Sequence, residues 1–216
     1  MTDVEGYTSE SEQVEALRKW WKDNGKSLIL GLALGLAGLA GYRYWDDTRN
    51  LKAESASVNY EQYLALIEKK SLDDARKAGQ TILDNYADST YARLTALLMA
   101  KSEITEGKTD AARQRLQWVL DHPGKDHLEA VARARLAQIA LAEGKADEAW
   151  RLLEQGGITK GDDYAELQGD ILAARGKHSE AVTLYQKAQQ QALASGGNPA
   201  VLELKLERLG HAGDGA

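Results

Sequence analysis

The feature that most constrains the fold of this chain is a six-residue pattern that occurs three times. It consists of Gly-Lys, three variable positions and Ala, and it begins at Gly107, Gly144 and Gly176. Glycine readily takes the left-handed conformation that ends a helix, and alanine five residues later lets the next helix pass close to its partner. The recurrence after 37 and 32 residues therefore predicts helical pairs in tandem.

The spacing of this pattern identifies the kind of array. Its two intervals bracket the 34-residue period of tetratricopeptide repeats, in which each repeat is a helix–turn–helix unit. A small residue stands seven positions before each repeated glycine: Ala100, Ala137 and Gly169. Leu153 and Tyr185 share one position in the second helices. We therefore predict three tetratricopeptide-like repeats.

Helical patterns flank these repeats on both sides. Residues 50–68 and 72–86 carry the apolar stripe of one further, degenerate helical pair. Asn198 and Pro199 suit the N-cap and first position of a last helix over residues 199–209, which would cover the open end of the array. The predicted fold is all-α, with a single N-terminal transmembrane helix and an α-solenoid of about four helical pairs with a C-terminal capping helix.

The transmembrane helix is predicted from sixteen uncharged residues between Lys26 and Arg43. A helix over residues 27–45 rises about 28 Å, close to the roughly 30 Å of a bilayer's hydrocarbon core. Aromatic residues gather at both of its ends, where a bilayer's interfaces would lie: Trp20, Trp21, Tyr42, Tyr44 and Trp45. We therefore expect a head at residues 1–26, a span at 27–45 in the lipid bilayer, a repeat domain at 46–210 and a flexible tail at 211–216.

A cleaved signal peptide is the alternative for this segment, since small residues at 38–40 suit a cleavage site. The segment that ends at Lys26 is long and holds six acidic and four basic residues, unlike a short, positive signal n-region. Four basic residues before the span against three after it weakly favour a cytoplasmic N-terminus. The head also has a helical pattern over residues 12–24, for the lipid surface or a partner, and Asn24-Gly25 is expected to break or bend the chain after it.

Within the span, small residues recur at helical spacing. Gly31 and Gly35 form a GxxxG pair, and Gly35, Gly38 and Gly41 follow at every third position. Missing side chains let another helix approach closely, so these glycines are a candidate packing face. The partner would be a second copy of the chain, in a homo-oligomer, or another membrane protein. The alternative is that glycine is simply common in membrane spans.

Composition argues against several classes of function. A net charge of −6 disfavours nucleic acid, and the absence of cysteine removes disulfides and thiol chemistry. The four histidines lack metal-binding spacing, although His122 and His127 flank a loop with Asp121 and Asp126 that could hold a metal weakly; a solvated loop is the simpler interpretation. No nucleophile elbow, Walker loop or dinucleotide fingerprint occurs. We predict no enzyme, no cofactor and no metal.

What remains is a binding surface, because the first helices of such repeats line a concave groove. Counting the repeated glycine as position 15 places four residues of each first helix in the groove: Leu94, Leu97, Lys101 and Ile104, then Val131, Ala134, Gln138 and Leu141, then Asp163, Glu166, Asp170 and Ala173. The gradient from apolar to acidic suits an extended, partly apolar or basic polypeptide. The alternative is that several of these residues belong to the core.

Several segments together resemble the YfgM family, the ancillary subunit of the bacterial SecYEG translocon. They are the run Gln13-Val14-Glu15-Ala16-Leu17, Asn24-Gly25-Lys26, the glycine-rich span, Gly41-Tyr42-Arg43-Tyr44-Trp45, and Leu167-Gln168-Gly169-Asp170 with Gly176-Lys177 and Ala181. The aromatic pair before Asn24 is Trp20-Trp21 here, a mild departure from the family's pattern. The resemblance covers nearly the whole chain.

This resemblance implies a single-pass protein of the cell inner membrane, with a cytoplasmic N-terminus and a periplasmic repeat domain. It implies three protein partners: the SecYEG translocon, a membrane-anchored prolyl-isomerase-like chaperone, and unfolded secretory polypeptides that are passed to periplasmic chaperones. It supplies no catalytic residues. Two alternatives are a structural scaffold of another envelope complex and a secreted soluble adaptor whose mature N-terminus lies near Gly41.

Overall fold

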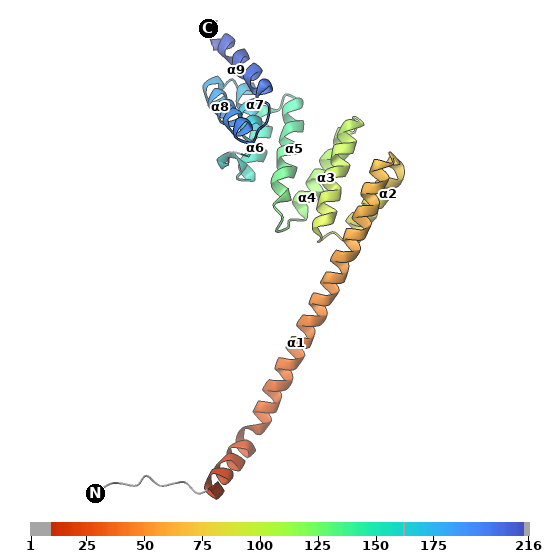
Figure 1. The fold of residues 1–216 in the computed structure, drawn as a ribbon, viewed down its shortest axis with the longest axis vertical. Coiled ribbons are helices and arrows are strands. Elements are labelled where there is room, and N and C mark those ends of the chain that lie inside the picture. The colour runs from red at the N-terminus through yellow and green to blue at the C-terminus, as the bar shows by residue number, and fades with distance from the viewer. Residues whose placement is uncertain (1–9, 162, 214–216) are drawn as a thin grey trace, which may run out of the picture. The chain divides into compact units, whose positions relative to one another are not determined.

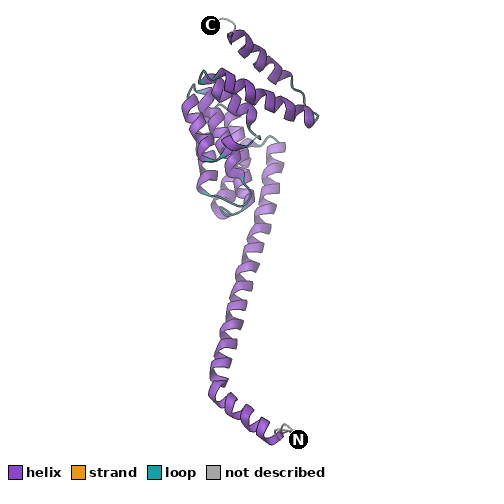
Figure 2. Cartoon of the chain, turned by 90° about the vertical axis from the view of Figure 1, so that its left-hand side faces the viewer, coloured by secondary structure: helices purple, strands orange, loops and turns teal. Residues whose placement is uncertain are grey.

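The computed structural model describes residues 10–161 and 163–213, and every regular element in that part of the chain is a helix (Figures 1 and 2). The helices are α1 (Glu10–Glu68), α2 (Leu72–Asn85), α3 (Thr90–Thr105), α4 (Thr109–Asp121), α5 (Leu128–Ala142), α6 (Ala146–Gln155), the 3-10 helix η1 (Ile158–Lys160), α7 (Ala165–Ala174), α8 (His178–Ala194) and α9 (Ala200–Gly213). The chain divides into two compact units, Met1–Glu54 and Ser55–Ala216.

The described part of the first unit is helical throughout and belongs to α1. Its segment Gln13–Tyr44 is long and apolar enough to cross a membrane. The large apolar side chains from Leu28 to Leu39 are 49–65% exposed, so no other element covers them as the core of a soluble domain would. A span surrounded by lipid accounts for this exposure.

Helix α1 is continuous at two places where the prediction allowed an interruption. It continues through Asn24 and Gly25, where the Asn24 side chain donates a hydrogen bond to the Trp20 carbonyl at 3.1 Å, so the chain does not break there. Figure 2 shows a bend near the N-terminal end of the helix, which agrees with the other form of that prediction. No separate helix begins at Asn50 either, because residues 44–68 contain neither glycine nor proline to end the preceding one.

The second unit is an array of helical pairs. Helices α3 and α4, α5 and α6, and α7 and α8 pack as pairs, and each pair packs on the next. The last turns of α1 and helix α2 form a fourth pair: Tyr63 is 1% exposed in their shared core, and the Tyr60 ring lies 5.4 Å from that of Tyr91 in α3. Helix α9 packs on α8 and caps the array. The predicted fold class is confirmed.

The repeated pattern has the local conformation that the sequence predicted. Gly107, Gly144 and Gly176 all have φ of +76°, in the left-handed region. The alanines five residues later, at the closest helix approach, are all fully buried: Ala112, Ala149 and Ala181. Each repeat therefore has a glycine stop and an alanine contact at the same places.

The interfaces between consecutive pairs share a second set of equivalent positions. Arg76 of α2 lies 3.1 Å from Glu106, which follows α3, and Arg113 of α4 pairs in the same way with Glu143, which follows α5. At the third interface the two positions hold Trp150 and Arg175, and the guanidinium lies 5.4 Å from the centre of the indole ring. A cation–π contact thus replaces the ion pair of the earlier interfaces.

The C-terminal helix begins one residue after the predicted start, at Ala200, and ends later than predicted. Asn198 Oδ1 accepts a hydrogen bond from the Ala200 N–H at 3.0 Å, and the Pro199 carbonyl accepts one from the Glu203 N–H at 3.0 Å. The helix continues past Leu209 to Gly213, so the first part of the predicted tail is helical. Residues 214–216 lie outside the described part of the chain.

Candidate binding groove

The predicted groove residues lie on the first helices of the repeats, α3, α5 and α7, and they differ in exposure. In α3, Leu97 is 5% exposed and part of the core, whereas Lys101 and Ile104 are exposed and Leu94 is half-buried. In α5, Ala134 is 4% exposed. Leu97 and Ala134 are therefore core residues, which is the alternative that the sequence left open for part of this set.

The other predicted residues remain accessible. Gln138 is exposed in α5, and Val131 and Leu141 are half-buried there. In the third repeat Glu166 is exposed and Asp170 is half-buried. Arg135 of α5 is half-buried, and its Nη1 donates a hydrogen bond to the Leu97 carbonyl of α3 at 2.8 Å.

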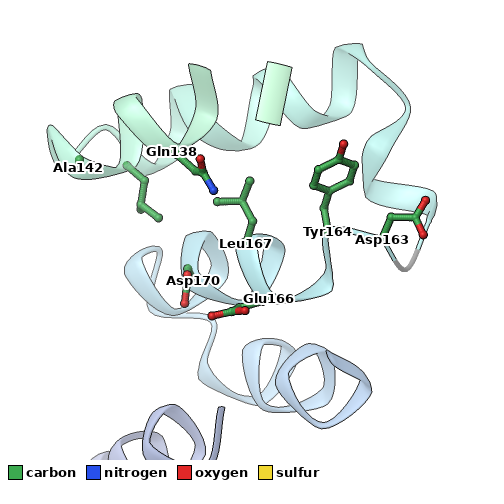
Figure 3. A pocket seen from close by; sticks show the side chains of 8 residues that line it. Gln138, Ala142, Asp163, Tyr164, Glu166, Leu167 and Asp170 are labelled. Carbon is green, nitrogen blue, oxygen red and sulfur yellow. The ribbon is translucent and has the colours of Figure 1, made fainter. Parts of the chain in front are cut away.

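A concave pocket of about 480 Å³ lies between α5 and α7. It brings together the predicted residues Gln138, Leu141, Asp163, Glu166 and Asp170, and its other lining residues are Ala142, Tyr164 and Leu167. Figure 3 shows Glu166 and Asp170 side by side on α7, with Asp163 and Tyr164 toward the other end of the pocket. Its wall is mixed, with leucine and tyrosine beside three carboxylates.

The loop before α7 positions one end of this pocket. Gln168 is 2% exposed, and its side-chain amide donates hydrogen bonds to the carbonyls of Ile158 and Gly161 at 3.0 and 3.1 Å. These bonds satisfy a buried amide and tie η1 and the following turn to α7. Asp163 and Tyr164 lie between Gly161 and the first residue of α7, so this contact restricts their positions.

The acidic end of the pocket is bound by a lysine that the sequence analysis missed. Lys205 of α9 places its ammonium 2.7 Å from Glu166 Oε1 and 2.7 Å from Asp170 Oδ1. The Tyr185 hydroxyl donates a hydrogen bond to the same Asp170 oxygen at 2.8 Å. Lys205 stands 39 positions after Glu166, and no periodic pattern in the sequence marks this contact.

These contacts shift the titration of the groups involved. Burial alone would lower the pKa of Lys205, but hydrogen bonds and the negative charges of Asp170 and Glu166 raise it above its ordinary value. Burial, followed by the hydrogen bond and charge of Asp170, raises the pKa of Tyr185. Lys205 therefore stays cationic, and Tyr185 stays a neutral hydrogen-bond donor, at physiological pH.

The histidine-flanked loop is organised by an arginine. Arg93 is 4% exposed and forms an ion pair with Asp126 at 2.5 Å, while the His122 ring stacks on Trp118 with 4.0 Å between ring centres. Asp126 is therefore half-buried and held by Arg93, whereas Asp121 and His127 in the same loop region are exposed. Among the described residues no three His, Asp or Glu side chains converge as a metal site, and the side chain of His211 lies outside them.

A second hollow of about 530 Å³ lies over the turns between α5 and α6 and between α7 and α8. Four of its charged lining residues are paired within the chain: Arg175 lies 2.9 Å from Asp147, Lys145 lies 2.9 Å from Glu143, and Lys177 lies 3.1 Å from Glu180.

Comparison with known proteins places this architecture in a family. The sequence model of the tetratricopeptide repeat-like domain matches residues 18–211. The chain is 29% identical to the ancillary SecYEG translocon subunit of Haemophilus influenzae over 190 residues, which cover 85% of this chain and 91% of that protein.

Two further relatives carry the same name and align over shorter stretches. The Escherichia coli protein is 30% identical over 113 residues, 52% of this chain and 54% of that protein. The Aggregatibacter actinomycetemcomitans protein is 35% identical over 96 residues, 44% of this chain and 47% of that protein. These alignments span about half the length of each relative. The chain thus belongs to the tetratricopeptide repeat-like domain family and, within it, to the YfgM family that its head, span and third repeat resemble.

Proposed function

We propose that this protein is a membrane-anchored ancillary subunit of the Sec translocon, and that its repeat domain binds newly translocated polypeptides and helps pass them to periplasmic chaperones. The observation that carries the proposal is the alignment over 85% of the chain with a relative named as such a subunit. In this proposal the N-terminus lies in the cytoplasm and the repeats lie in the periplasm. A membrane-anchored prolyl-isomerase-like chaperone is the expected partner for transfer.

The architecture supports this function by combining an anchor with a binding surface. The apolar segment of α1 is exposed along its length, and the first helices of the repeats carry accessible side chains beside a mixed apolar and acidic pocket. Tethering raises the local concentration of such a surface around an emerging chain, so weak contacts suffice for capture. An extended, unfolded segment fits a groove better than a folded domain does.

Site-specific photo-crosslinking in cells tests this proposal. A crosslinker at Lys101 or Gln138, both exposed on first helices, is expected to capture secretory polypeptides or a periplasmic chaperone. A crosslinker at Gly35 is expected to capture a translocon subunit. Gln114, exposed on the second helix α4, is the matched control and is expected to capture neither. Repeated capture of no client and no chaperone from either groove position contradicts polypeptide handling.

A structural scaffold of an envelope complex is the second candidate function. Two observations favour it, because each reduces the surface of the first helices that is free to bind a polypeptide. Leu97 and Ala134 are buried in the core, and Lys205 already pairs with Glu166 and Asp170. Affinity purification in mild detergent separates the two functions. Recovery of another envelope complex without translocon subunits favours the scaffold.

A further inference from the structure

We propose that the pocket between α5 and α7 binds a lysine or arginine side chain of a partner polypeptide, and that Lys205 of α9 is the chain's own competitor for that position. This inference rests on the proposed binding of polypeptides and adds a specificity to it. The apolar walls would receive the neighbouring residues of the same extended segment.

The first support is the set of carboxylates in the pocket. Asp163, Glu166 and Asp170 contribute three negative charges, and Lys205 forms ion pairs with the last two. Two further cations act only at longer range, Arg135 on Tyr164 and Arg208 on Tyr185, and among the described residues neither forms an ion pair with these carboxylates. Asp163 is exposed and makes no described ion pair or hydrogen bond. Glu166 engages Lys205 through Oε1 only. A second cation therefore finds carboxylate oxygens that the fold leaves available.

The second support is that an ammonium already occupies this position. Lys205 contacts both Glu166 and Asp170 from a separate helix, at distances of charge-assisted hydrogen bonds. Its side chain is 24% exposed, so it reaches the carboxylates from the solvent-accessible side. The same geometry can be made by the lysine of another chain.

Helix α9 can release Lys205 without leaving the array. The helix is held on α8 by apolar side chains, among them Leu202, which is 6% exposed, and Leu206 and Leu209. The flexible lysine stem can turn outward by rotating its own bonds while these contacts persist. The Tyr185 hydroxyl keeps its hydrogen bond to Asp170 and preserves the site for an incoming cation.

The pocket lining suits both the alkyl stem and the charged end of a lysine or arginine side chain. Leu141, Leu167 and Tyr164 present apolar surface beside the carboxylates of Glu166 and Asp163. Lysine and arginine bury their alkyl stems on apolar surface while their charged ends stay with polar groups. A polypeptide that alternates apolar and basic residues is therefore the preferred occupant, and an acidic one is excluded by repulsion.

Fluorescence anisotropy with two labelled peptides tests this inference. One peptide alternates leucine and lysine, the other alternates leucine and glutamine at the same length, and the full chain is held in detergent. The lysine peptide is expected to bind about fivefold or more tightly than the glutamine peptide, and this preference should fall as salt is added.

Three variants locate the preference in the pocket. Glu166→Gln should reduce the preference for the lysine peptide. Lys205→Met should increase affinity for the lysine peptide about threefold and leave the glutamine peptide unchanged, because it removes the competing ammonium. Asp84→Asn, which removes one negative charge from α2, is the matched control and should change neither affinity.

The outcomes separate this inference from the function on which it rests. Equal affinity for the two peptides overturns the inference and leaves polypeptide binding in place. Failure of the full chain to bind either peptide overturns both. If Lys205→Met weakens both peptides while the helical circular dichroism is unchanged, Lys205 only tethers α9 and the proposed competition is wrong.

Discussion

Pairs of residues at equivalent positions set the distance between the two helices of each repeat. The first helix supplies Ala100, Ala137 or Gly169, and the second helix supplies a large partner, Leu153 in the second repeat and Tyr185 in the third. A Cβ atom added at Gly169 would lie 2.6 Å from the Tyr185 ring. Compared with the second repeat, the third therefore has a smaller residue on its first helix, glycine in place of alanine, and a larger one on its second helix, tyrosine in place of leucine.

Replacing Gly169 with alanine should destabilise the third repeat by about 2 kcal/mol, because the ring must move out of a packed core. The double variant Gly169→Ala/Tyr185→Leu reproduces the residue types of the second repeat and should recover part of this loss. Thermal unfolding of the full chain in detergent, followed by circular dichroism, measures both. A double variant less stable than Gly169→Ala alone would contradict the size-matching argument. Gly210→Ala, at a helical position with open space around it, is the control.

The ion pair between Arg93 and Asp126 should make stability depend on acid. Burial would raise the pKa of Asp126, but hydrogen bonds from Arg93, Thr90 and the Leu128 N–H, with the charge of Arg93, lower it below its ordinary 3.8. Because the pKa of Asp126 is lower in the folded chain than in the unfolded chain, the ionised carboxylate stabilises the fold at pH values above its ordinary pKa. This stabilisation is lost as the pH falls through the folded-state pKa.

Asp126→Asn should cost about 3 kcal/mol near pH 7, because it leaves the buried guanidinium without its counter-charge. The cost should begin to shrink below about pH 3.8, where the carboxyl of the unfolded wild-type chain takes up a proton, and should disappear only when the pH falls below the lower folded-state pKa of Asp126. Denaturant unfolding at pH 7 and pH 3 checks both statements. A pH-independent cost would show that shape rather than charge holds the loop.

Helix α9 closes the array with one face and leaves the other exposed. Leu202 is 6% exposed against α8, whereas Leu204 on the same helix is 63% exposed. Leu202→Ala should therefore destabilise the chain by about 3 kcal/mol by leaving a cavity in the third core cluster. Leu204→Ala should change stability by less than about 0.5 kcal/mol. Similar effects of the two substitutions on the thermal midpoint would mean that α9 does not cap the array through this face.

The glycines of the span make a separate prediction about helix association. A Cβ atom would meet open space at each of these four glycines, Gly31, Gly35, Gly38 and Gly41. A larger residue there therefore does not disturb the helix itself. Gly35→Ile should weaken association with another membrane helix by about tenfold, because close backbone approach is lost. Leu36→Ile adds no bulk and is the control. Quantitative co-purification with translocon subunits, and energy transfer between labelled copies, distinguish a foreign partner from a second copy.

Across the whole molecule, the sequence predicted features that depend on local conformation and missed those that depend on distant packing. The glycine stops and buried alanines were predicted because each is dictated by one turn of backbone and one close contact. The pairing of Lys205 with Glu166 joins residues 39 positions apart, and no periodic pattern marks it. The continuity of α1 had a signal in the absence of glycine and proline between Trp45 and Glu68.

The orientation of the molecule across the membrane has the weakest sequence signal, since four basic residues precede the span and three follow it. The proposed function requires the repeats to lie in the periplasm. Because the chain contains no cysteine, single substitutions provide clean reporters. A membrane-impermeant maleimide added to cells with a permeabilised outer membrane should label Ser179→Cys, on the exposed start of α8, and should leave Glu15→Cys unlabelled until detergent is added. The reverse pattern would place the repeat domain in the cytoplasm, where the groove could not meet polypeptides that have crossed the membrane.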